Sequence, residues 1–433
     1  MSAVTETAEG TEATPASGPS LQAAKHWGIP VAMLVLGGLS LLVFGFGTQG
    51  GLYTSFAISR PTDFIIIEPF SLPSRITAII ASALALAVAA YVTWRVREGK
   101  RIGWWPGVVY GVLLMTALLS WAGAGKESTN VQITGLLTGA VVLSIPLVFG
   151  ALSGTLCERS GVINIAIEGQ LLAGAFLSAV VASAFGNPYL GLIAAPIAGA
   201  LVGALLSLFA VKYWVDQIVV GVVLNVLVVG ITNFMFGTLL RENPGLNDAP
   251  GLPRLPIPGL SSIPIIGPAL FNHTALVYLM YATVAVMAVM LFRSRWGLRV
   301  RAVGEHPKAA DTVGIKVNRT RVRNTILGGA IAGLGGAFFT IASGLAFGKE
   351  MTSGAGFIAL AAMILGRWHP VGALGAALLF GFANSLKDQL GIIGSDVPSQ
   401  FLAMLPYLAT ILAVAGFVGH ARPPAAEGKP YKK

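Results

Sequence analysis

Charge, cysteine and catalytic motifs are all scarce in this 433-residue chain. Charged residues make up 11% of it, against roughly a quarter in a soluble domain. The single cysteine, Cys157, excludes a disulfide within one chain. The five histidines show no metal-ligand spacing, and "AGAGKES" at 122–128 lacks the first glycine and the hydroxyl that a phosphate-binding loop needs. The sequence therefore predicts no metal site and no enzyme.

Apolar residues dominate the chain, at 55% with a mean hydropathy of +0.77. The apolar runs reach about twenty residues, the length that crosses a bilayer as a helix, whereas a β-barrel would show shorter alternating segments. We therefore predict an all-α polytopic membrane protein with about twelve membrane segments. They fall near 29–48, 76–94, 105–123, 131–152, 163–185, 189–211, 217–238, 275–292, 325–347, 355–366, 370–386 and 399–419.

Basic residues set the expected orientation. The net charge of +10 is typical of cytoplasmic loops in a multi-span protein, so no nucleic-acid partner is predicted. The densest basic loop, Arg293–Arg323, should be cytoplasmic. Counting crossings from it places both termini in the cytoplasm. The Pro- and Gly-rich stretch 239–274 then lies outside, as a linker or as a docking surface.

Two stretches suggest an internal repeat. Residues 187–208 and 369–386 both begin with X-Pro and continue with small residues. By the expected topology the two regions cross in opposite directions, which is the inverted-repeat arrangement of transporters.

Polar residues inside the apolar segments are the candidate path residues. A carboxylate at bilayer depth costs at least ~2.5–3.5 kcal/mol, so Glu168 should face a cavity or a partner, on the same helical face as Asn164. The sequence leaves open a structural role, in which backbone amides near Gly161 or Gly169 satisfy the carboxylate, and a substrate-lining role. The side chains of Asn225 and Asn233, in segment 217–238, could likewise either form contacts between helices or line the path. The candidate substrate path comprises Asn164, Glu168, Asn225 and Asn233.

Four stretches carry a resemblance to a known family. They are "ERSGVINIAIEGQLLAGAF" (158–176), "RAVGEHPKAADTVGIKV" (301–317), "GGAIAGLGGAFFTIASG" (328–344) and "GFIALAAMILGRWHPVGALGAALLFG" (356–381). The chain resembles the permease subunits of ATP-binding-cassette importers for nucleosides and simple sugars, above all the nucleoside branch. The resemblance implies the type II importer transmembrane fold with an inverted internal repeat, and covers roughly residues 130–420.

The resemblance also implies a coupling segment that docks on the ATPase. Pro307 suits the first turn of a helix and Gly314 suits its end. We expect one short cytoplasmic helix here, with two adjacent alanines forming a smooth surface; His306 departs mildly from the family pattern. The residues that match the motif are Gly304, Glu305, Pro307, Ala309, Ala310, Gly314 and Ile315.

The resemblance further implies an assembly. Expected partners are ATP-binding-cassette ATPase subunits, a second permease in a homo- or heterodimer, an extracytoplasmic substrate-binding lipoprotein and the lipid bilayer of a bacterial inner (plasma) membrane. No cofactor is expected in this chain, because the partner subunit hydrolyses ATP. The alternatives are a simple-sugar permease of the same family and a proton-coupled secondary carrier. The predicted divisions are a disordered cytoplasmic tail (1–27), extra transmembrane helices (28–125), the permease domain (126–421) and a cytoplasmic tail (422–433).

Overall fold

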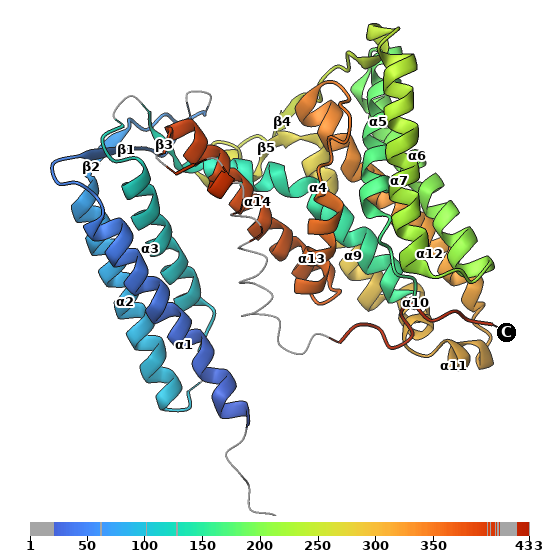
Figure 1. Cartoon of the computed structure of the whole chain (residues 1–433), viewed down its shortest axis with the longest axis horizontal. Coiled ribbons are helices and arrows are strands. Elements are labelled where there is room, and N and C mark those ends of the chain that lie inside the picture. The colour runs from blue at the N-terminus through green and yellow to red at the C-terminus, as the bar shows by residue number, and fades with distance from the viewer. Residues whose placement is uncertain are drawn as a thin grey trace, which may run out of the picture. The chain divides into compact units, whose positions relative to one another are not determined.

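The computed structural model is helical throughout its membrane segments (Figure 1). It describes residues 21–60, 63–100, 102–126, 129–395, 397–398, 400–402, 404, 407 and 422–432. Within these residues, nine helices are long and apolar enough to cross a membrane. Each of the eleven predicted segments up to residue 386 corresponds to a helix, although the helices at 355–366 and 370–386 are not among those nine. Most of the twelfth segment, 399–419, lies outside the described residues. The tail predicted for 1–27 lies outside them up to Ser20, and the first helix begins at Leu21.

The chain divides into two compact units. Unit 1 comprises Met1–Thr54 and Leu72–Gly125, and unit 2 comprises Ser55–Ser71 and Lys126–Lys433. The segment 55–71 thus leaves the extra N-terminal helices and belongs to the larger unit.

Unit 1 is built from three helices: α1 (Leu21–Ser40), with a π-helical end at Leu41–Phe46, α2 (Ser74–Arg97) and α3 (Trp105–Ala122). Buried alanines recur every four residues along one face of α2, at Ala81, Ala85 and Ala89. Small residues on such a face let helices approach closely in a membrane. The Tyr110 hydroxyl donates to the Met33 carbonyl, which pairs a polar group that lipid cannot satisfy.

Unit 2 is organised around α4 (Ile133–Arg159). In its most apolar 18-residue window, 72% of the residues are buried. It packs against α12 (Val317–Ala337), α13 (Ala355–Leu365) and α14 (Pro370–Ile393). The other elements of the unit are α5 (Ile167–Phe185), α6 (Pro188–Ser207), α7 (Gln217–Met235), α8 (Ile266–Leu270), α9 (Ala275–Arg293), α10 (Arg295–Glu305) and α11 (Pro307–Thr312), with π-helical ends at Leu208–Lys212, Phe236–Leu240 and Phe338–Gly344 and a 3-10 turn at Pro244–Asn247.

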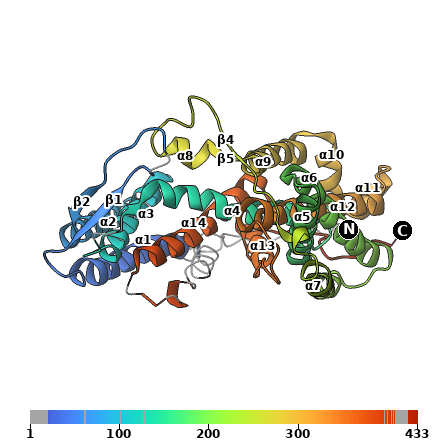
Figure 2. The same ribbon diagram turned by 90° about the horizontal axis from the view of Figure 1, so that it is seen from above.

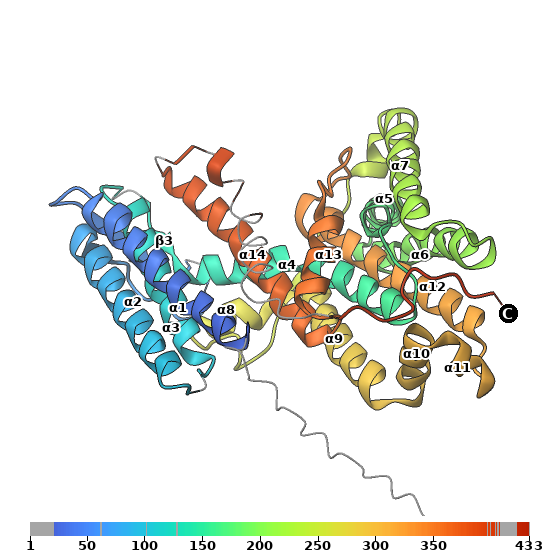
Figure 3. The ribbon, with the colours of Figure 1, turned by 60° about the horizontal axis from the view of Figure 1, so that its bottom comes forward.

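Glycines bring α6 and α12 into backbone contact, and Figure 3 shows the two helices side by side. A Cβ built on Gly199 would lie 2.1 Å from the carbonyl oxygen of Gly329, and one on Gly333 would lie 2.4 Å from that of Ala195. No side chain fits at such distances. Close backbone packing therefore replaces the hydrophobic effect, which cannot drive helix association within lipid.

Short strands form two small sheets among the described residues. β1 (Tyr53–Ala57) pairs in parallel with β3 (Val131–Gln132), placing Phe56 opposite Val131, while β2 spans Phe70–Pro73. β4 (Arg254–Pro256) pairs antiparallel with β5 (Asn272–Thr274), close to α8 (Figure 2).

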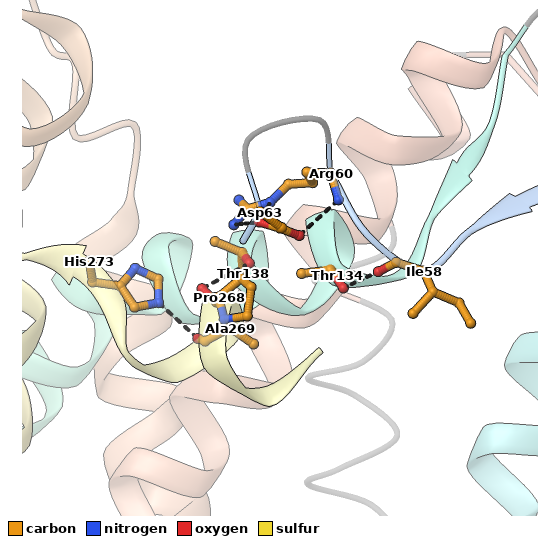
Figure 4. Close-up of polar contacts among 8 residues, drawn as sticks. All are labelled: Ile58, Arg60, Asp63, Thr134, Thr138, Pro268, Ala269 and His273. Carbon is orange, nitrogen blue, oxygen red and sulfur yellow. Dashed lines mark hydrogen bonds and ion pairs between the residues drawn. The ribbon is translucent and has the colours of Figure 1, made fainter. Parts of the chain in front are cut away.

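Segment 55–71 is fixed to this part of unit 2 by specific contacts (Figure 4). The Thr134 hydroxyl donates to the Ile58 carbonyl, and Arg60 forms an ion pair with the buried Asp63 carboxylate at 3.1 Å. The neighbouring Thr138 hydroxyl donates to the Pro268 carbonyl at 3.4 Å. The Thr134–Ile58 hydrogen bond and the pairing of β1 with β3 tie 55–71 to the rest of unit 2.

Candidate translocation core and coupling segment

A non-helical connection separates α4 from α5. α4 ends at Arg159, α5 begins at Ile167, and Gly161 between them has φ +90°, a conformation that favours glycine. Buried backbone groups in such a break need partners. The side chain of Gln217 accepts from the Ile163 amide at 2.7 Å, and Asn225 supplies further partners from α7.

Glu168 lies in the first turn of α5 and is 9% exposed. Its Oε1 accepts from the Thr352 hydroxyl at 2.6 Å and from the Gly354 amide at 2.8 Å, and its Oε2 accepts from the Gly356 amide at 2.6 Å. These amides open α13, where the backbone donors have no partner within the helix and the dipole favours an anion. Glu168 thereby caps a helix that is distant in sequence.

This arrangement differs from the sequence expectation in one respect. The amides were expected from Gly161 or Gly169, but they come from Gly354 and Gly356, about 190 residues further along. A Cβ on Gly356 would lie 2.4 Å from the Glu168 amide nitrogen, so only glycine lets the two backbones meet. The "SGAG" stretch at 353–356 is the sequence signal for this partner, and it was missed.

Asn164 does not share a face with Glu168, because it lies in the connection before α5 begins and the helical spacing does not apply. It exchanges hydrogen bonds with Gln170, at 3.0 and 3.1 Å between the two amide groups, and donates to the Ser153 hydroxyl at 3.0 Å. All three side chains are fully buried. The network fixes the break against α4.

The two candidate asparagines of α7 lie in different surroundings. Asn225 is buried, accepts from the Gly169 amide at 2.8 Å and donates to the Ile165 carbonyl at 2.9 Å, so it holds the end of the break and the first turn of α5. Asn233 lies two turns further along and donates to the Glu350 carboxylate at 3.3 Å. The structure therefore brings Asn164, Glu168 and Asn225 to one region and leaves Asn233 apart.

The candidate coupling segment forms two helices instead of the single one expected. α10 ends at Glu305, His306 breaks the helix with φ −139°, and Pro307 opens α11. The break allows α10 to pack tightly: a Cβ on Gly304 would lie 2.2 Å from the Arg159 carbonyl oxygen at the end of α4. After α11 the chain turns at Gly314, whose φ is +84°.

The two alanines of α11 differ in exposure, so they do not form one smooth exposed surface. Ala310 is 3% exposed and packs with Val303 of α10 and Val317 of α12, whereas Ala309 is exposed. Val313, just after α11, is 75% exposed. That exposed apolar side chain was not singled out from the sequence. The helix thus has an inner face fixed to the bundle and an outer face available to a partner.

Comparisons with known proteins agree with this architecture. The chain matches the family described as "Branched-chain amino acid transport system / permease component" over residues 136–415. It is 41% identical over 317 residues to the guanosine ABC transporter permease protein NupQ of Bacillus subtilis (strain 168), covering 70% of this chain and 98% of the relative.

Two further relatives show the range of the family. The nucleoside ABC transporter permease protein NupC of Lactococcus lactis subsp. cremoris (strain MG1363) is 38% identical, covering 69% of this chain and 96% of the relative. The putative glucose ABC transporter permease protein TsgC13 of Haloferax volcanii is 34% identical, covering 65% and 91%. No solved structure matches the chain significantly. The chain is a multi-pass membrane protein that belongs to this family of transport-system permease components.

Proposed function

We propose that this chain is the permease subunit of an ATP-driven importer for nucleosides. The observation that carries the proposal is the similarity over nearly the full length of NupQ and NupC, whose names describe guanosine and nucleoside transport. The two-faced α11 supports it, because a short helix with a buried inner face and an exposed outer face suits transmission of movement from an ATPase.

The proposal includes the assembly. A separate ATPase docks on the outer face of α11 and hydrolyses ATP, so this chain needs no cofactor of its own. A second permease completes the translocation path, and an extracytoplasmic lipoprotein delivers the substrate. Both termini lie in the cytoplasm of a bacterial cell, because the basic loop before α12 favours that side.

Within the path, Asn164, Glu168, Asn225 and Asn233 remain the proposed polar residues. The geometry of the first three supports a role in holding the broken helix, so they would shape the path more than grip a substrate. Such weak contacts suit a permease that must release what it passes. Tight recognition would fall to the external binding protein.

A sugar permease is the second candidate, because TsgC13 is named as a putative glucose permease. A proton-coupled carrier has less support. A protonated carboxyl at Glu168 would need an acceptor, and two of its three partners are backbone amides that only donate.

Uptake in proteoliposomes tests these candidates. The chain is reconstituted with its second permease, ATPase and binding lipoprotein, and radiolabelled guanosine and glucose are supplied with and without ATP. We expect ATP-dependent guanosine uptake that excess glucose does not inhibit. Glucose uptake alone would favour the sugar permease, and pH-driven uptake without ATP would contradict the importer.

Docking of the ATPase is tested by single aspartate substitutions on the outer face of α11. Val313→Asp and Ala309→Asp should weaken co-purification of the ATPase while the bundle stays folded, because both side chains are exposed. The matched control is Val215→Asp, at an exposed position in the loop just before α7, which lies on the same side of the membrane in the proposed topology. Undiminished co-purification of both α11 variants would contradict the docking assignment.

A further inference from the structure

The C-terminal segment 422–432, here called the tail strap, runs beside α10 and α11 (Figure 1). It contains no helix, yet Pro424 and Ala426 are buried. A segment without helix or strand gains burial only where specific partners hold it, so its contacts identify what it connects.

The first contact is with the candidate coupling segment. The Ala426 amide donates to the Gly304 carbonyl at 2.9 Å, and the Ala425 amide donates to the Glu305 carboxylate at 3.2 Å. Tyr431 packs against the cluster that includes Ala310, on the inner face of α11. The strap therefore holds both the end of α10 and the inner side of α11.

The second contact is with Arg321 of α12, which is 1% exposed. Its Nη1 donates to the Lys429 carbonyl at 2.7 Å and its Nη2 to the Ala426 carbonyl at 3.4 Å. A buried guanidinium needs acceptors, and these two come from the strap. The guanidinium also lies against Gly161, where a Cβ would come within 2.6 Å of Nη2.

The third contact is with the α4–α5 connection. The Glu427 carboxyl lies close to that of Glu158 at the end of α4, and burial raises the pKa of Glu427. The Trp368 indole donates to the same Glu158. Gly428, which follows Glu427 in the strap, has φ +73°, and a Cβ there would lie 2.9 Å from the Ile163 side chain.

We infer that the tail strap is a positioning segment that ties the coupling segment to the α4–α5 connection. It touches Gly304 and Glu305 on one side and Glu158 and Ile163 on the other, and that connection leads directly to Glu168. Contiguous hydrogen bonds and packed side chains of this kind carry coupling between distant sites. The inference rests on the proposed function, since it assigns the strap to the route from the ATPase to the broken helix.

Two variants displace the strap by different means. Gly428→Val places a β-branched side chain at positive φ and against Ile163. The second variant lacks 422–433 and carries Arg321→Met, which removes the guanidinium that truncation would leave without acceptors. Pro430→Ala, at an exposed position of the same strap, is the matched control.

The readout is the full complex with ATPase, second permease and binding lipoprotein in proteoliposomes. ATPase co-purification, thermal stability, ATP hydrolysis and guanosine uptake are measured on each variant. We expect both displaced variants to retain the ATPase and their stability, while uptake per ATP hydrolysed falls about tenfold, within the usual range for coupling between sites. Pro430→Ala should match the unmodified chain.

Other outcomes would overturn the inference. Uptake per ATP within about twofold of the unmodified chain would show that coupling does not use the strap. Loss of the ATPase from the displaced variants would make the strap a docking surface instead of a positioning segment. If the unmodified chain itself retained no ATPase, the proposed function would fail and this inference with it.

Discussion

The helix pairs α5–α6 and α13–α14 invite comparison, because the sequence marks both as halves of a repeat. In each pair the second helix opens with X-Pro, and the side chain before the proline caps it. Asn187 accepts from the Tyr189 amide at 2.9 Å, and His369 accepts from the Val371 amide at 3.3 Å. The second helices begin alike in chemistry and in geometry.

The first helices differ. α5 is 19 residues long and carries Glu168 in its first turn, whereas α13 has 11 residues, Gly354 at its N-cap and no side-chain cap of its own. Glu168 supplies the missing cap. The two halves are therefore complementary where they meet, with a carboxylate on one and free amides on the other. The buried position of the Glu168 carboxylate is therefore explained by the amides at the start of α13, which it accepts from.

Removing the carboxylate should have the largest effect. Glu168→Leu leaves one buried amide, one part-buried amide and one hydroxyl without an acceptor, at about 1–3 kcal/mol each, which should abolish the folded chain. Detergent-purified yield and melting temperature measure this. Glu350→Leu is the control, because that carboxylate is exposed. Equal behaviour of the two variants would contradict the capping role.

Crowding the other side of the same contact should have the next largest effect. Gly356→Ala places a methyl group 2.4 Å from the Glu168 amide nitrogen and should destabilise the chain by about 1–3 kcal/mol. Gly375→Ala on α14 meets nothing within 4 Å and should stabilise its helix slightly. The two melting temperatures should move in opposite directions; a shared shift would show that the contact does not limit stability.

Glu168→Gln keeps the shape of the side chain and one acceptor oxygen. Its side-chain NH2 group replaces the other oxygen, so one donor of the pocket then faces another donor. We expect a loss of about 1–3 kcal/mol in stability and a partial loss of ATP-driven uptake. Uptake at several pH values, with Glu68→Gln at an exposed position as control, tests this. Complete loss of uptake and of its pH dependence in a chain of unchanged stability would point to proton transfer instead.

The caps of the second helices should contribute least. Asn187→Ala and His369→Ala should each cost about 1 kcal/mol in the free energy of unfolding. Similar costs would support the likeness between the pairs; a large difference would weaken it.

Only the His369 cap should depend on pH. Burial, and secondarily the charge of Arg159, lowers the pKa of His369 below its ordinary value near 6.5. The unfolded chain then binds the proton more readily, so the folded chain should lose stability as the pH falls through that value. Melting temperatures of the unmodified chain and of His369→Asn measure this between about pH 7.5 and about pH 5.5, which is about one pH unit on either side of the ordinary histidine pKa. An unchanged pH slope in His369→Asn would contradict it.

Much of the fold followed from the sequence, because its signals are local. Apolar runs of spanning length predicted the helices, and the family match confirms the permease fold. X-Pro positions marked helix starts, and Gly314 marked the turn after α11. In each case one residue type fixes a backbone conformation or removes a hydrogen bond, so no distant partner is needed.

The candidate site was only partly accessible in this way. The cost of burying Glu168 predicted that it has a partner, but the partner amide of Gly354 lies 186 residues away in sequence. The split of Ala309 from Ala310 depended on α10 and α12 packing against one side of α11. The contacts of the tail strap could not be predicted from the sequence, because four of them are made by backbone groups of the strap, which do not depend on residue type.

The sequence by itself determined that this is a polytopic helical permease with a buried carboxylate that must be satisfied and a segment before α12 that must turn at defined residues. Hydrophobic length, glycine and proline act within a few residues, and the bilayer imposes the rest. Only the tertiary structure decided which amides meet Glu168, which face of α11 stays exposed, and that the C-terminal residues satisfy Arg321. Those pairings depend on how closely distant backbones approach, and that distance is set by the packing of the whole bundle.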